Sequence, residues 1–178
     1  MVNIAKKKLP TAAISVIVYL SYCAMSWFSM RGTLAYLGQK YGIGGWFAND
    51  AWAFFLGGLI PFLLYEVFTS FVFKMTAARA GGDIKSLQYG LNYAVIAANL
   101  LLFALKFMYI ALPLYAAVID IIIDPAVTLA FVGLYMWYAF YQNYVDKTRY
   151  RLVLSQVMST FAGVYGLLAL VNVIVAVA

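Results

Sequence analysis

The sequence lacks histidine and holds a single cysteine, Cys23. Without histidine the chain cannot supply a His-bound haem, His-dependent zinc catalysis, or a Ser-His or Cys-His nucleophile. One cysteine excludes an internal disulfide, a CxxC redox pair and a thiolate metal cluster. The sequence also shows no phosphate loop, acidic metal motif or catalytic dyad. We therefore expect a protein that is not an enzyme and that uses no cofactor or metal.

Charge is also scarce: charged residues make up 10% of the 178 residues, whereas apolar residues reach 66% and the mean hydropathy is +0.92. A soluble domain is roughly half apolar and about a quarter charged. So few charges cannot cover a water-soluble surface, which excludes a soluble globular protein, a disordered tail and a nucleic-acid-binding domain. The composition predicts an all-α, polytopic transmembrane helix bundle that forms one integral membrane domain over residues 1–178.

Five apolar runs are long enough to cross a bilayer core of about 30 Å, which takes roughly 20 helical residues. They cover residues 11–30, 51–73, 88–112, 126–145 and 152–178. We expect a glycine-rich connection over residues 31–50 and a turn at Asp120–Pro125. Cleavage of the first run as a signal peptide would leave four spans, and re-entry of residues 114–123 would give six.

The basic residues predict the orientation, because cytoplasmic loops carry an excess of Lys and Arg. With the N-terminus in the cytoplasm and the C-terminus outside, the cytoplasmic segments hold nine of the twelve basic residues: Lys6, Lys7, Lys8, Lys74, Arg79, Lys85, Lys147, Arg149 and Arg151. The outer segments hold only Arg31 and Lys40. The short Lys-rich start favours a prokaryotic plasma membrane, and an endomembrane is the alternative.

Four polar residues inside the predicted spans are the candidate binding residues: Glu66, Asn92, Asn99 and Lys106. Because a charge in hydrocarbon costs about 3 kcal/mol or more at mid-depth, such residues are functional candidates. Asn92, Asn99 and Lys106 follow one another at intervals of seven, which places them on one helix face.

The depth of these residues along their helices predicts their partners. At 1.5 Å per residue, Glu66 lies near the level of Asn99 and about 15 Å from that of Lys106. We therefore favour a Glu66–Asn99 hydrogen bond over a Glu66–Lys106 ion pair, and expect Lys106 to snorkel to the outer interface or to meet Asp120. The polar residues either join helices or form a proton- or cation-binding site centred on Glu66.

Small residues and a proline interrupt the second run ahead of Glu66. Gly57 and Gly58 let two helix backbones approach closely, and Pro61 frees a backbone carbonyl. We expect a packing kink, with a broken-helix ion site as the alternative.

Residues 74–87 form the connection between the second and third spans. Gly81 and Gly82 predict a turn after a helix end, where glycine adopts left-handed backbone angles freely. Arg79 and Lys85 are then expected to contact anionic lipid headgroups, each attracted by about 1 kcal/mol.

The stretch from Lys74 to Tyr93 carries a basic residue, a Gly-Gly pair, a polar residue and a run into a Tyr-containing helix. Together with Gly133–Tyr138 and the short basic loop that follows, it resembles the Ypt-interacting-protein (Yip) family of five-span membrane proteins, in a short prokaryote-like form. In eukaryotic members the resemblance implies vesicle trafficking and contact with small GTPases. That role depends on a long polar N-terminal region, where this chain has ten residues before its first span.

We therefore expect a non-enzymatic, Yip-like integral membrane protein that acts through helix packing with membrane partners or lipids. Its partners would be the bilayer and other membrane proteins or further copies of itself, and no nucleic acid. Two alternatives stay open. The first is a small transporter, or a substrate-binding transporter subunit, with a polar site around Glu66, and the second is an accessory subunit of a larger membrane complex.

Overall fold

The structure is a computed structural model that describes residues 10–42, 49–80, 83–107 and 119–177. These residues are helical throughout apart from short connections and caps, and the described ranges contain no strand. The elements are α1 (Thr11–Tyr41), α2 (Asp50–Ala80), α3 (Ile84–Lys106), the π-helix η2 (Ile119–Ile123), α6 (Asp124–Tyr141) and α7 (Tyr150–Val177). The structure thus confirms the predicted all-α fold class.

Five of these helices are long and apolar enough to cross a membrane. Their spanning segments are Thr11–Gly32, Asp50–Val72, Ile84–Lys106, Asp120–Tyr141 and Tyr150–Leu170. The third helix ends at Lys106, and residues 108–118, which include Pro113 and the first half of the predicted re-entrant stretch, lie outside the described residues.

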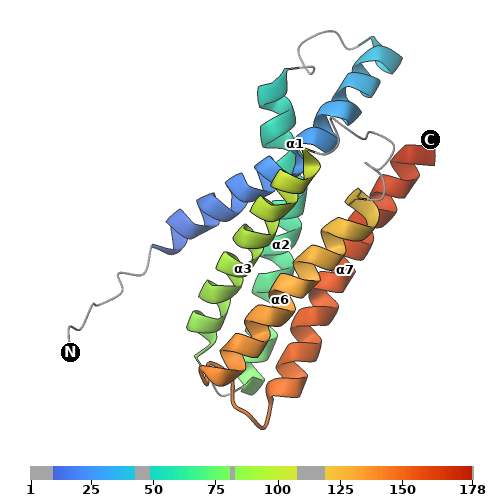
Figure 1. Cartoon of the computed structure of the whole chain (residues 1–178). Helices are drawn as coiled ribbons and strands as arrows, with labels where there is room; N and C mark the ends of the chain where they lie inside the picture. The colour runs from blue at the N-terminus through green and yellow to red at the C-terminus, as the bar shows by residue number, and fades with distance from the viewer. Residues whose placement is uncertain (1–9, 43–48, 81–82, 108–118, 178) are drawn as a thin grey trace.

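Helices α2, α3, α6 and α7 run side by side, while the N-terminal part of α1 leans away from them (Figure 1). α1 packs on α2 and α3, α6 packs on α3 and α7, and α2 also contacts α7. This arrangement brings the end of α3 beside η2 and the start of α6, with the middle of α1 close by.

Helix α1 is longer than predicted, because it continues to Tyr41 through residues expected to form a connection. Gly42 ends it with a φ of 62°, the left-handed conformation that commonly stops a helix. The first part of the predicted connection is therefore helical, because Gly32 and Gly38 lower helix stability without breaking the helix, while the spanning segment itself ends at Gly32, close to the predicted bound.

The packing of α1 on α2 depends on Gly58. A Cβ at this position would lie 2.4 Å from Sγ and 2.5 Å from the backbone nitrogen of Cys23. Pro61 lies within the unbroken helix α2. Close packing therefore accounts for Gly58, as the packing interpretation of this segment predicted.

The predicted turn at Asp120–Pro125 was wrong, because η2 leads directly into α6. Pro125 occupies the first turn of α6, where the missing backbone N–H costs nothing. Asp120 and Asp124 are four residues apart in this helical segment, so their side chains project from the same side.

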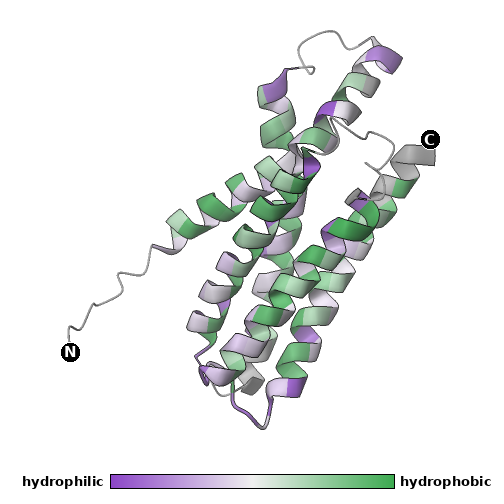
Figure 2. Ribbon diagram, viewed as in Figure 1, coloured by the Kyte–Doolittle hydropathy of each residue, from purple (hydrophilic) through white to green (hydrophobic). Residues whose placement is uncertain are grey.

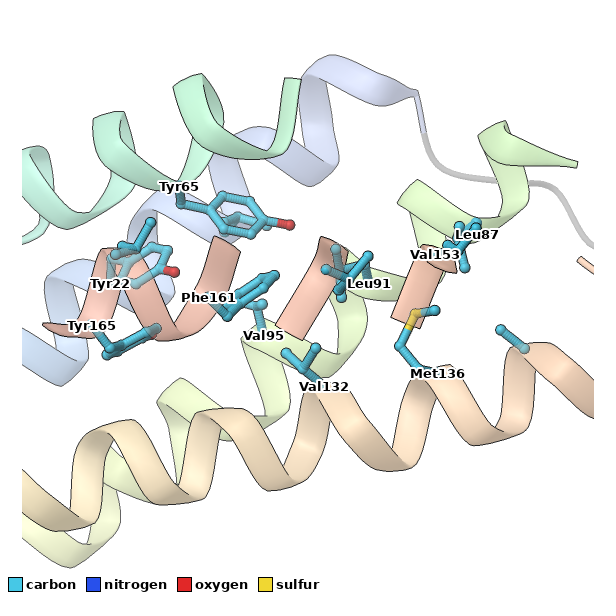
Figure 3. Packing of buried hydrophobic residues seen from close by; sticks show 14 of the residues in the cluster. Tyr22, Tyr65, Leu87, Leu91, Val95, Val132, Met136, Val153, Phe161 and Tyr165 are labelled. Carbon is cyan, nitrogen blue, oxygen red and sulfur yellow. The ribbon is translucent and has the colours of Figure 1, made fainter. Parts of the chain in front are cut away.

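The interior is filled by large apolar and aromatic side chains from all five long helices (Figure 3). Hydrophobic residues also occur along the length of the helices, and hydrophilic residues gather toward the helix ends and connections (Figure 2). Val67, Phe71, Leu134 and Trp137 are each more than half exposed. Helices that are apolar on all sides are typical of a bundle whose outer surface faces lipid.

Candidate ionic site within the membrane-spanning bundle

Lys106, the last residue of α3, lies in the interior with a side chain only 2% exposed. Its Nζ is 2.8 Å from Oδ1 of Asp120 and 2.6 Å from Oδ2 of Asp124. The ammonium thus bridges the two carboxylates that η2 and α6 place on one side. A buried charge is tolerated only when it is paired and hydrogen-bonded in this way.

Ser29 connects the middle of α1 to the same cluster. Its Oγ lies 3.1 Å from Oδ1 and 3.0 Å from Oδ2 of Asp120, to which the hydroxyl donates. The cluster of Lys106, Asp120, Asp124 and Ser29, called the ionic site below, therefore joins α1, α3 and the η2–α6 segment.

The ionic site holds more negative than positive charge. Two carboxylates face one ammonium, which gives a formal charge of −1 when all three groups are ionised. Asp124 is 6% exposed, and its Oδ1 is buried without a hydrogen-bond partner among the described residues. One strong acceptor of the site is therefore unused.

A pocket of about 160 Å³ adjoins the ionic site. α1, α2 and α7 supply its walls, and the three charged residues form its polar end. The lining residues are Met25, Ser26, Ser29, Met30, Gly57, Ile60, Pro61, Lys106, Asp120, Asp124, Tyr165, Leu168 and Ala169. Apart from the charged end, two serines and the Tyr165 hydroxyl, this lining is apolar, a combination typical of small-molecule sites.

The prediction that Lys106 meets Asp120 is confirmed. The alternative, in which Lys106 snorkels to the interface, is wrong because the side chain is almost fully buried. The placement of Asn92, Asn99 and Lys106 on one helix face is also confirmed, since all three are buried on α3.

The predicted pairing of Glu66 with Asn99 is wrong. Asn99 Nδ2 donates to Ser21 Oγ at 3.0 Å, so this residue joins α3 to α1 rather than to α2. Glu66 is half-buried and makes no ion pair with Lys106, whose described carboxylate partners are Asp120 and Asp124. Glu66 therefore lies outside the ionic site and does not line the pocket.

Asn92 joins α3 to α2, because its Oδ1 accepts a hydrogen bond from the Tyr65 hydroxyl. Both side chains are buried. A neutral pair of this kind is what helix-joining polar residues in membranes usually form.

Three buried tyrosines, Tyr22, Tyr65 and Tyr165, gather around Phe161 (Figure 3). The ring centroids of Tyr22 and Tyr65 are 5.8 Å apart, and those of Tyr65 and Phe161 are 6.0 Å apart. A second cavity of about 10 Å³ lies among them, close to the smallest volume that holds one water. The Tyr165 hydroxyl is buried without a hydrogen-bond partner among the described residues.

Sequence reasoning missed Asp124, Ser29 and Tyr165. The spacing of Asp120 and Asp124 by four residues is the signal that could have placed both carboxylates on one face, had the segment been recognised as helical. Nothing in the sequence pattern singles out Ser29 or Tyr165, because their positions depend on how α1 packs on α3 and how α7 packs on α2 and α6.

The predicted cytoplasmic turn is only partly described. Gly81, Gly82 and the side chain of Arg79 lie outside the described residues, and Lys85 is exposed in the first turn of α3. Asp83 caps this helix by accepting a hydrogen bond from the Ser86 backbone nitrogen at 3.1 Å. The contact of these residues with lipid headgroups stays a prediction.

Comparison of the chain with family models, with curated proteins and with solved structures finds no match. The resemblance to the Yip family therefore stays a prediction that depends on the sequence motifs alone.

Proposed function

We propose that the protein is a non-enzymatic membrane transport protein, or the substrate-binding subunit of one, whose functional centre is the ionic site. The observation that carries this proposal is the unpaired Oδ1 of Asp124, buried in a spanning helix beside a pocket. Charged residues inside membrane spans commonly mark the path of an ion or substrate.

A purely structural role would need only one carboxylate for one ammonium. The second carboxylate adds a further negative charge with little access to water, and removing a charge from water carries a desolvation cost. Binding of a proton or of a cationic group neutralises the site and removes this cost. The ionic site can thus change its charge with occupancy, which is the basic requirement for coupling solute binding to ion movement.

The basic residues support an orientation with the N-terminus in the cytoplasm and the C-terminus outside. In that orientation the ionic site lies in the outer half of the membrane, because Lys106 ends the third span. A plasma membrane of a prokaryote is the location that we propose, with the pocket loading from the outer side.

The Yip-like role, in which the protein packs against membrane partners or lipids, and the role of an accessory subunit are the competing hypotheses. Both treat Lys106, Asp120 and Asp124 as a structural ion cluster. They predict that neutralising Asp124 leaves any partner assembly intact and changes no solute movement.

Transport is tested with the full chain reconstituted in proteoliposomes. Currents are recorded on a solid-supported membrane after addition of cationic, anionic and zwitterionic solutes, each with and without an imposed pH gradient. The parent protein is expected to give a current with at least one class, and Asp124→Asn is expected to abolish it. Asp146→Asn is the matched control, because Asp146 is exposed in the connection between α6 and α7. Absence of current from the parent with all three classes would refute the proposal.

A further inference from the structure

We infer that the pocket binds a small organic cation, with its positive group at the carboxylates and its apolar part against α1, α2 and α7. This inference deepens the proposed function by naming the class of ligand. It begins with charge: the polar end of the pocket has one more carboxylate than ammonium, so a monovalent cation makes the occupied site neutral.

Asp124 provides the contact for the positive group. Its Oδ2 is engaged by Lys106, whereas its Oδ1 is buried and has no partner among the described residues. An anionic ligand would place a third negative charge beside two carboxylates. A bare metal ion prefers several oxygen ligands, and here Lys106 already occupies the space between the two carboxylates.

The walls of the pocket suit an apolar body. Met25, Met30, Ile60, Pro61 and Leu168 line it, and Tyr165 adds a ring whose face attracts cations. Methionine is polarisable and adapts to irregular shapes, which favours binding of alkyl or aryl groups.

The volume of the pocket limits the size of the ligand. At about 160 Å³, it is close to the roughly 150 Å³ of an engineered cavity that holds benzene. A ligand of about six to ten non-hydrogen atoms fits this volume. A choline-sized quaternary ammonium or a benzylammonium belongs to this class, and a bulky lipophilic dye does not.

The same cationic group can come from a free solute or from the headgroup of a membrane lipid such as phosphatidylcholine. Both would present an ammonium to Asp124 and an alkyl surface to the methionines. The two sources differ in one testable way: a lipid headgroup is lost from the pocket when that lipid is replaced by another, whereas a free solute is not.

Binding is tested by calorimetry on the full chain in detergent, with three probes of matched shape. They are choline, its uncharged carbon isostere dimethylbutanol, and the corresponding anion dimethylbutanoate. Choline is expected to bind at least about tenfold more tightly than the other two, because only its trimethylammonium carries the positive charge that the carboxylates and the face of the Tyr165 ring attract. Equal affinity for choline and dimethylbutanol, or tighter binding of the anion, would overturn the inference.

Two variants tie the binding to this pocket. Asp124→Asn is expected to weaken choline binding about tenfold or more while leaving dimethylbutanol binding unchanged, and Asp146→Asn to leave both unchanged. If Asp124→Asn does not fold, Ala169→Phe serves instead, since it fills the pocket without altering a charge. Unchanged choline affinity in the variant that folds would contradict the inference.

The source of the cation is resolved in nanodiscs. If a lipid headgroup occupies the pocket, choline binds in phosphatidylglycerol nanodiscs and is excluded in phosphatidylcholine nanodiscs. If the ligand is a free solute, choline binds equally in both, and either result supports the cation class.

Failure of this inference is distinguishable from failure of the proposed function. Choline binding without any solute-driven current would support the cation site and refute transport. Currents driven only by anionic solutes would support transport and refute the cation site.

Discussion

Two polar regions lie along α3, and they differ in charge: the first contains neutral side chains and the second contains ionisable ones. In the first, Asn92 and Asn99 are neutral and each is joined to a neighbouring helix by one hydrogen bond, with Tyr65 and Ser21 respectively. In the second, Lys106 is held by two carboxylates, one of which keeps an unused oxygen. Asn99 Oδ1 is also buried without a hydrogen-bond partner among the described residues, so an unused acceptor occurs in both regions. The charged region differs in its net charge, because it holds one acidic group more than its single ammonium neutralises.

Removal of the Lys106 ammonium is expected to lower the unfolding free energy more than any other change considered for the two regions. Lys106→Met leaves two buried carboxylates without their cation, so unfolding free energy is expected to fall by about 3–5 kcal/mol. Unfolding in detergent with increasing dodecyl sulfate measures the loss. A triple variant that also carries Asp120→Asn and Asp124→Asn is expected to recover much of it, because no buried charge then remains. A loss below about 1 kcal/mol in Lys106→Met would show that the carboxylates are already solvated or protonated.

Both regions depend on α1 lying close to its neighbours, and Gly58 tests that shared requirement. Gly58→Ala is expected to destabilise the protein by about 1–3 kcal/mol, because its Cβ would meet the Cys23 backbone. Gly163→Ala is the control, since a Cβ at Gly163 meets nothing within 4 Å. Alanine there is expected to be neutral or to stabilise α7, as it has the higher helix propensity. The same unfolding assay measures both variants. Equal unfolding free energies for Gly58→Ala and Gly163→Ala would mean that α1 and α2 pack less closely at Gly58 than the structure shows.

The neutral region is expected to show a smaller effect. Asn99→Leu removes the hydrogen bond to Ser21, with an expected loss of about 1 kcal/mol. Combining it with Ser21→Ala is expected to add little, because both variants break the same bond. Additive losses in this double-mutant cycle would indicate that Asn99 acts through another partner.

Asp146 is an exposed carboxylate with which the buried carboxylates of the ionic site can be compared. In the connection after α6, hydrogen bonds from the backbone nitrogen and hydroxyl of Thr148 lower the pKa of Asp146 below its ordinary value. A lowered pKa means that the contribution to stability is present above the unfolded pKa and disappears as pH falls through the folded one. Thr148→Val is expected to raise the pKa of Asp146 toward its ordinary value, as measured by carboxyl-carbon NMR. No change would indicate that the backbone donor alone sets it.

The five helices were predictable because long apolar runs dominate this sequence, and few other structures tolerate them. The shared face of Asn92, Asn99 and Lys106 was predictable because helical spacing is local. The meeting of Lys106 with Asp120 was predictable because both lie near the same membrane face.

The wrong predictions come from two assumptions: that polar residues at equal depth on adjacent spans pair with each other, and that the proline-containing segment before the fourth span is a turn. α1 leans across the bundle and brings Ser21 to Asn99, so equal depth did not decide the partner (Figure 1). Pro125 was interpreted as a break, although proline is compatible with the first helical turn. That error concealed Asp124, the residue on which the proposed site now depends.

The close approach at Gly58 also makes the single thiol, Cys23, a probe of the contact between α1 and α2. Cys23 is fully buried beneath α2, with its Sγ 4.0 Å from the carbonyl oxygen of Phe55. A thiol reagent can reach it only when α1 and α2 separate, so the alkylation rate of the unmodified chain reports how often that contact opens. Because Gly57, beside Gly58, lines the pocket, the same rate would reveal whether an occupant holds the two helices together or drives them apart.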